Sequence, residues 1–195
     1  MPAKKILVVF AHPLLERSQI NRELIKAYDQ AQVEWVDLYE KYPDFLFPIA
    51  YEKELLEAHD IICLHHPLYW FSAPPLLKQW LDVVFEVGWA FGPGGNALRG
   101  KKLMQIITTG GSAHAYTATG ANGAPIHDFL KPFEQTARVC QMDYLPPFVV
   151  HGTHRLSMQQ ILSYRSDLQL LMTKLQNPSF VNQPFLPNST MNDYV

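Results

Sequence analysis

The chain has 195 residues, of which 48% are hydrophobic and 17% are charged, and its formal net charge is -2. This size and balance fit one globular domain with an ordinary core and exclude a disordered chain. The slight negative charge disfavours nucleic acid as a partner, because proteins that bind nucleic acids usually carry a basic surplus.

The first part of the chain alternates apolar runs with helical patterns. Lys5 to Phe10 is a near-continuous apolar run, which is typical of a parallel strand covered on both faces. An amphipathic helix then opens at Ser18, whose hydroxyl can accept from the free amides of the first helical turn. Val33 to Leu38 is predicted as a second strand, Tyr51 to Ala58 as a short helix, and Asp60 to His65 as a third, buried strand.

The same alternation continues to the end of the predicted domain. Two prolines suit the first turn of a helix, where missing amide donors cost little, and a serine with a glutamine three residues later forms a capping-box pattern. The predicted elements are a helix that opens at Pro74 and Pro75, a strand at Lys102 to Thr108, a helix over about Pro125 to Cys140, a strand at Pro147 to His151, and a helix capped by Ser157 and Gln160 that runs to about Leu175.

Strands that alternate with helices predict a parallel sheet with helices on both faces. Right-handed crossovers leave few topologies, and the leading one is an α/β, flavodoxin-like three-layer sandwich with a five-stranded parallel sheet in the order 2-1-3-4-5. We expect a single domain of this fold over residues 1–176 and a C-terminal tail over residues 177–195. The tail is polar and rich in proline, and we expect it to pack on a partner subunit.

Ligands of an open parallel sheet bind at the carboxyl ends of its strands, near the point where the strand order reverses. The first loop at this edge, His12 to Asn21, runs into the start of a helix. Free amides and the positive end of a helix dipole favour a phosphate there, and Ser18, Asn21, His12 or Arg17 could add donors or charge. The alternative is an ordinary capped helix with solvated charges.

The second loop, His66 to Ala73, places large apolar residues at the end of a strand, where they would normally be buried. A planar aromatic ligand would explain them, with the backbone around Tyr69 and Trp70 contacting its polar edge. The alternatives are packing against the next helix or a subunit interface.

The third loop contains Thr108, Thr109, Gly110 and Gly111. The two glycines let the backbone approach a ligand closely and present amide donors. Such donors could stabilise negative charge on a reduced flavin. The alternative is a simple glycine-rich turn.

Three other patterns are rejected. Gly95 to Lys102 nearly matches a phosphate-binding P-loop, but Lys102 stands where a serine or threonine must bind magnesium, and a strand follows it. His65 and His66 are strand neighbours that point to opposite faces, and no spacing fits a zinc site, so we expect no metal. A GxGxxG motif after the first strand is also absent, so any nicotinamide nucleotide would bind transiently as a substrate and not as a resident cofactor.

The three loops form an ordered set of motifs between Lys5 and His151. These motifs are AHP at Ala11 to Pro13, Arg17-Ser18 before Asn21, PLYWF at Pro67 to Phe71, Pro75 to Lys78 with Trp80, and TTGG at Thr108 to Gly111 with Tyr116. In this order they resemble the flavodoxin-like NAD(P)H dehydrogenase (quinone) family.

Within that family the chain is most similar to the ancillary flavoproteins of glutathione-regulated potassium-efflux antiporters. Four segments carry this likeness: Leu38-Tyr39, Tyr42 to Phe45, Gly92 to Asn96, and Leu145 to Pro147. Pro48 departs from the pattern, because that branch commonly has an acidic residue there.

The resemblance implies a flavin cofactor, with FMN favoured and FAD as the alternative. It assigns the cofactor phosphate to His12, Ser18, Gln19, Ile20 and Asn21. It assigns the ring system to Pro67, Leu68, Tyr69, Trp70, Phe71, Thr108, Thr109, Gly110 and Gly111.

The resemblance also implies the activity of an NAD(P)H:quinone-type oxidoreductase. NAD(P)H would pass a hydride to the flavin and leave, and a quinone or similar electrophile would then accept the hydride at the same place. Tyr116 would donate a hydrogen bond to the substrate oxygen, assisted by His127 or, alternatively, His114. A one-electron flavodoxin carrier is disfavoured by the mild charge and the aromatic pocket.

The family implies a homodimer, and the efflux branch implies the cytoplasmic face of a potassium-efflux antiporter as a partner. The competing hypothesis is therefore a regulatory subunit whose reductase activity is secondary. Lys4 and Lys5 precede only a short apolar run, unlike a signal peptide, and no apolar stretch approaches the roughly 20 residues that span a bilayer. We therefore expect a cytoplasmic protein, with a peripheral position at the inner face of the membrane as the alternative.

Overall fold

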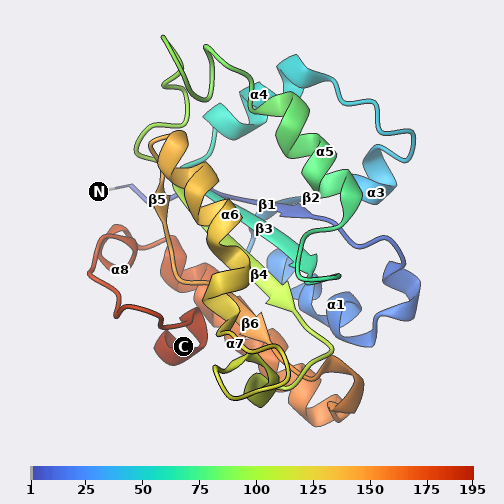
Figure 1. Ribbon diagram of the computed structural model, residues 1–195. Helices are drawn as coiled ribbons and strands as arrows, with labels where there is room; N and C mark the ends of the chain where they lie inside the picture. The colour runs from blue at the N-terminus through green and yellow to red at the C-terminus, as the bar shows by residue number, and fades with distance from the viewer. Residues whose placement is uncertain (1) are drawn as a thin grey trace.

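A computed structural model describes residues 2–195 and shows a parallel sheet between two layers of helices (Figure 1). The strands are β1 (Ile6–Phe10), β2 (Glu34–Asp37), β3 (Ile61–Pro67), β4 (Lys102–Thr108), β5 (Asp143–Tyr144) and β6 (Phe148–Val150). The helices are α1 (Gln19–Leu24), α2 (Lys26–Gln30), α3 (Leu38–Lys41), α4 (Ile49–Glu57), α5 (Pro75–Val84), α6 (Ile126–Val139), α7 (Met158–Leu175) and α8 (Pro178–Val181).

The sheet has the order β2-β1-β3-β4-β5, and every strand pair is parallel. This confirms the flavodoxin-like fold and the predicted order of the first four strands. The fifth predicted strand corresponds to β6, which pairs with β4 at Ile106 to Thr108. The short strand β5 pairs with the start of the same β4 and was not predicted, because its two residues carry no apolar pattern.

Successive strand residues point to opposite faces, so each strand contributes to two cores. Ile6 and Val8 of β1 lie in the core under α1, α2 and α7, whereas Leu7 and Val9 lie in the core under α3 to α6. The helix predicted from Ser18 is interrupted only at Ile25, whose dihedral angles remain helical. None of the helices over residues 2–195 is long and apolar enough to cross a membrane.

The C-terminal tail packs on its own domain. Met191 is fully buried in the core that contains α7, and its amide donates to the carbonyl of Pro147 at 2.8 Å. The Asn192 side chain bonds both backbone groups of Val149 in β6, at 2.8 and 3.1 Å. These contacts explain an ordered tail within one chain, and its contact with a partner subunit stays a prediction.

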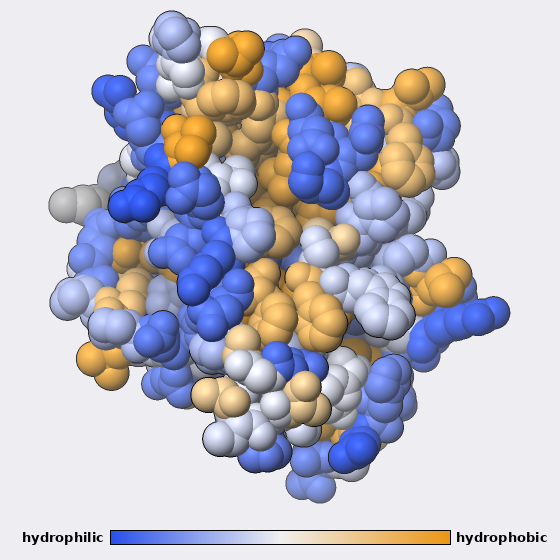
Figure 2. All heavy atoms as spheres, in the orientation of Figure 1, coloured by the Kyte–Doolittle hydropathy of each residue, from blue (hydrophilic) through white to orange (hydrophobic). Residues whose placement is uncertain are grey.

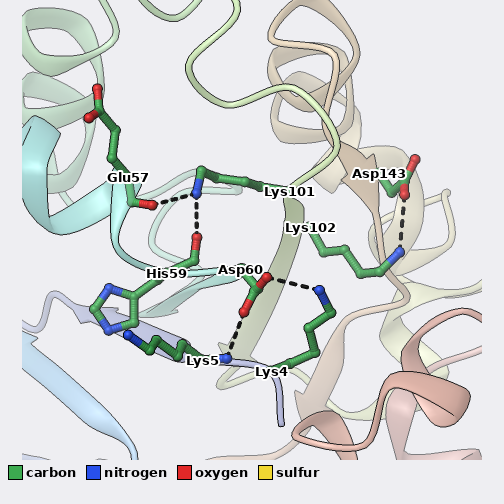
Figure 3. A network of polar contacts seen from close by, with 8 residues as sticks. All are labelled: Lys4, Lys5, Glu57, His59, Asp60, Lys101, Lys102 and Asp143. Carbon is green, nitrogen blue, oxygen red and sulfur yellow. Dashed lines mark hydrogen bonds and ion pairs between the residues drawn. The ribbon is translucent and has the colours of Figure 1, made fainter. Parts of the chain in front are cut away.

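A polar network ties the amino ends of the strands together (Figure 3). It comprises Lys4, Lys5, Glu57, His59, Asp60, Lys101, Lys102 and Asp143. The carboxylate of Asp60 accepts from Lys4 Nζ and from the Lys5 amide, each at 2.9 Å. Lys101 Nζ donates to the carbonyls of Glu57 and His59. These cations are therefore used to join β1, β3 and β4, at the end of the sheet opposite the predicted ligand loops.

Candidate functional site

A cavity of about 480 Å³ lies where the predicted loops after β1, β3 and β4 converge. This volume lies within the range of small-molecule sites, roughly 300–1,000 Å³. It is lined by His12, Leu14, Arg17, Ser18, Gln19, Ile20, Asn21, Pro67, Leu68, Tyr69, Thr108, Gly110, Thr153, His154 and Leu156. The structure thus brings together residues of all three predicted loops, together with a fourth segment after β6.

Six of the predicted site residues do not line this cavity: Trp70, Phe71, Thr109, Gly111, Tyr116 and His127. The fourth segment, Thr153 to Leu156, was missed by the sequence reasoning. The rule for parallel sheets could have predicted it, because this segment follows a parallel strand whose carboxyl end lies at the same edge of the sheet.

The first loop builds part of the cavity wall. Ser18 caps α1, and its Oγ accepts from the Asn21 amide at 3.3 Å. His12 is buried, and its Nδ1 accepts from the Leu14 amide at 3.1 Å. Burial lowers the pKa of His12, so this ring is neutral near pH 7 and adds hydrogen bonding rather than charge. Arg17 is therefore the cationic side chain of the loop.

The second loop bends through two strained residues. Trp70 and Phe71 have φ angles of 47° and 62°, which bulky side chains rarely adopt. The turn places Trp70 in solvent, 93% exposed, while Phe71 stacks on Phe129 with ring centroids 5.0 Å apart. The cavity wall on this side consists of Pro67, Leu68 and Tyr69 instead.

The third loop has a backbone amide without a side chain at Gly110, beside the cavity. The Gly110 amide donates to no acceptor within residues 2–195 and is free for a ligand. A Cβ at Gly110 would lie 3.1 Å from the His154 ring, so the loop and the fourth segment are closely packed here. Glycine is therefore the residue that keeps this corner of the cavity open.

Tyr116 lies beside the cavity with His151 as its neighbour. The two rings are tilted, with centroids 5.4 Å apart. Thr109 Oγ1 donates to the Gly111 carbonyl at 2.8 Å, so it accepts from His151 Nδ1 at 3.1 Å. Burial raises the pKa of Tyr116 and lowers the pKa of His151. Near neutral pH, the tyrosine keeps its proton and the histidine is uncharged.

His127, the partner assigned to Tyr116 by resemblance, contacts the C-terminal tail. Its Nε2 lies 3.0 Å from the Ser189 carbonyl, so it holds the C-terminal tail on α6. His114 lies in the same 3-10 helix as Tyr116, Ala113–Tyr116, and its own side chain is exposed. The histidine ring that lies against the Tyr116 ring is that of His151, the residue after β6. Over residues 2–195 no three side chains of the metal-ligating types converge.

A family model described as a flavodoxin-like fold matches residues 4–170. General stress protein 14 of Bacillus subtilis (strain 168) is 45% identical over 160 residues, covering 80% of this chain and 90% of that protein. The glutathione-regulated potassium-efflux system ancillary protein KefG of Salmonella paratyphi B is 45% identical over 161 residues, covering 82% and 88%.

Solved structures give the same similarity in three dimensions. General stress protein 14 from Treponema denticola, in complex with FMN, has a TM-score of 0.83 at 38% identity, covering 88% of this chain and 99% of that one. A thermophilic tryptophan halogenase enzyme from Streptomycin violaceusniger has a TM-score of 0.82 at 36% identity, covering 92% and 99%. An NADPH-quinone reductase from P. pentosaceus has a TM-score of 0.77 at 32% identity, covering 89% and 98%.

Proposed function

The chain belongs to the family defined by this flavodoxin-like fold, and from that premise we propose that it is an FMN-dependent oxidoreductase that transfers electrons from NAD(P)H to a quinone or similar electrophile. The observation that carries the proposal is the convergence of the three predicted loops on one cavity at the carboxyl edge of the sheet. The similar proteins that contain FMN or are named as NADPH-quinone reductases support it.

The residues around the cavity fit FMN by their chemistry. On the first loop, the Ser18 hydroxyl and the Arg17 guanidinium suit a phosphate. On the second and third loops, Pro67, Tyr69 and the open backbone of Gly110 suit a flat ring with a polar edge. We propose that these groups hold the cofactor, with the other predicted cofactor residues around them.

FMN supplies two-electron hydride chemistry when it is bound. The protein's own contribution is to orient the substrate and hold a proton. The Tyr116 hydroxyl remains protonated at neutral pH, since burial raises its pKa, and it can donate a hydrogen bond to an oxygen of the electron acceptor. The uncharged His151 bonds Thr109, and its ring lies against the tyrosine ring.

We predict that Tyr116→Phe lowers kcat for quinone reduction about tenfold, because one hydrogen bond to the reacting substrate is lost. FMN affinity should stay within about twofold, since in this proposal the hydroxyl bonds the substrate and not the cofactor. Steady-state NADPH oxidation with a simple benzoquinone, by protein loaded with FMN, measures the first quantity. Tyr51→Phe, an exposed tyrosine on α4, is the matched control. An unchanged kcat in Tyr116→Phe would remove this role, and no turnover by the wild-type protein would contradict the proposed activity.

A second candidate function is that of an ancillary subunit of a potassium-efflux system, with reductase activity secondary. The specific support is the 45% identity to proteins of that name. Such a subunit would act at the cytoplasmic face of the membrane. Co-purification of the full chain with a membrane antiporter would favour this function, whereas quinone turnover without any such association would favour the first.

A homodimer is also part of the proposal. A groove of about 390 Å³ lies between α5 and α6, with Leu81, Phe85, Phe91, Phe133 and Val139 among its lining residues. Figure 2 shows hydrophobic side chains gathered in the hollow between these helices. An open apolar surface of this kind supports pairing with a second copy of the chain.

A further inference from the structure

A buried polar relay runs from the interior of the domain to the wall of the cavity. Its members are Tyr28 of α2, His65 of β3, Asn21 of α1, and the hydroxyl groups of Ser18 and Thr108. Tyr28 and His65 are fully buried, and Asn21 is 1% exposed. Tyr28 and His65 do not line the cavity, so any effect they have on a ligand must pass through Asn21.

Tyr28 sets the direction of the relay. Over residues 2–195, the one hydrogen-bond partner of its hydroxyl is His65 Nδ1, at 2.5 Å. A buried hydroxyl hydrogen needs an acceptor, so Tyr28 donates and His65 Nδ1 accepts. Burial, with smaller effects of His66 and His12, lowers the pKa of His65 well below its usual value. The ring is therefore neutral, and its single hydrogen lies on Nε2.

This tautomer fixes the orientation of the Asn21 amide. His65 Nε2 donates to Asn21 Oδ1 at 2.9 Å. With its oxygen turned to His65, Asn21 turns its nitrogen toward the cavity side. Nδ2 then donates one hydrogen to Ser18 Oγ at 2.8 Å and the other to Thr108 Oγ1 at 3.2 Å.

The relay leaves Ser18 with one function. Its Oγ accepts from Asn21 Nδ2 and also from the Asn21 backbone amide, at 3.3 Å. Both lone pairs are then used, and the hydroxyl hydrogen is free to donate to a ligand. If the Asn21 amide were flipped, Ser18 would donate its hydroxyl hydrogen to Asn21 Oδ1. It would then present a lone pair to the ligand, and a lone pair repels an anion.

We propose that Tyr28 and His65 are positioning residues that make Ser18 a hydrogen-bond donor to the phosphate of the flavin, and thereby favour FMN over flavins that lack the phosphate. The inference rests on the proposed function, because it takes FMN as the ligand of the cavity. It adds to that function a source of cofactor selectivity that lies outside the cavity.

The test compares FMN with riboflavin, which has the same ring and side chain but no phosphate. The dissociation constants of both are measured by quenching of flavin fluorescence, on full-length protein freed of flavin. His65→Leu removes the donor to Asn21 and should weaken FMN about tenfold, the value of one charge-assisted hydrogen bond. Riboflavin affinity should change by less than about twofold. His65→Gln, whose amide can still donate to Asn21, should restore most of the preference for FMN.

Two further variants keep the test decisive. Tyr28→Phe removes a single oxygen and carries the test if His65→Leu does not fold; it should lower the preference for FMN about threefold, since the relay can then adopt either direction. His66→Leu is the matched control, because His66 is equally buried, is the next residue of β3 and bonds Gln105 instead. It should change the two affinities together or not at all.

The outcomes separate the two claims. If the ratio of the two affinities is the same in the wild-type protein, His65→Leu and Tyr28→Phe, the relay has no role in selectivity. If His65→Leu weakens FMN and riboflavin equally, its role is structural and the inference is wrong. If the wild-type protein binds neither flavin, the proposed function itself fails.

Discussion

Replacing Gly110 by valine is expected to weaken FMN binding by about two orders of magnitude. The third loop faces the fourth segment so closely that the first side-chain carbon would lie 3.1 Å from the His154 ring. Valine adds two more methyl groups at a corner where the cavity must admit a flat ring. Overpacking of this kind costs about 1–3 kcal/mol, and the lost contacts with the ring add to it. Fluorescence titration of the flavin-free variant with FMN measures the effect.

Two controls separate occupied space from damage to the fold. Gly110→Ala should give a smaller loss than Gly110→Val, because the effect rises with the added volume. In the double variant Gly110→Val with His154→Ala, the clash with histidine is removed but the valine still stands in the cavity, so FMN should remain weakly bound. Recovery of wild-type affinity in the double variant would contradict the placement of Gly110 beside the ring.

Glu52→Ala is expected to destabilise the protein by about 3 kcal/mol, roughly 10 °C in Tm. Glu52 is fully buried in α4 and accepts from Trp80 Nε1 of α5 at 2.8 Å and from the Tyr42 hydroxyl at the end of α3. Lys41 lies 3.4 Å away as its cationic partner. Alanine would leave the buried donors of Tyr42 and Trp80 without an acceptor, which costs more than the lost bonds themselves. Thermal unfolding of the flavin-free protein checks the change.

The matched control for Glu52 is Glu54→Ala, an exposed position on the same helix, which should shift Tm by less than about 2 °C. Glu52→Gln keeps the shape and one acceptor and should fall between the two. If Glu52→Ala unfolds at the same temperature as Glu54→Ala, the carboxylate does not join α3, α4 and α5 as argued. FMN affinity measured well below Tm should be little affected, because Glu52 lies outside the cavity lining.

The fold was largely predictable because its signals are local. Continuous apolar runs such as Ile61 to Leu64 are typical of strands buried on both faces, and the capping box of Ser157 and Gln160 marks the start of α7 as predicted. The strand β5 could not be found, because Asp143 and Tyr144 owe their pairing to the neighbouring β4. The packing of the C-terminal tail on Val149 could not be predicted from the sequence either, since it depends on contacts between distant segments.

The candidate site was predictable to the extent that it follows from the parallel sheet. The rule for the carboxyl ends of strands predicts the loops that hold Ser18, Pro67 and Gly110 at one cavity. The orientation of individual side chains was not accessible. Trp70 points into solvent because two left-handed residues turn the loop, and His127 is bound to the C-terminal tail. The relay through His65 depends on long-range contacts that no spacing reveals.

The central claim is that this chain binds FMN at the carboxyl edge of its sheet and reduces it with NAD(P)H. The most direct measurement is the absorbance spectrum of the purified protein after reconstitution with FMN and removal of free flavin, followed by NADPH under anaerobic conditions. We predict a protein-bound flavin spectrum that is bleached by NADPH and restored by a quinone. Two results would contradict this claim. One is a protein that retains no flavin after reconstitution, and the other is a bound flavin that stays oxidised when NADPH or NADH is added.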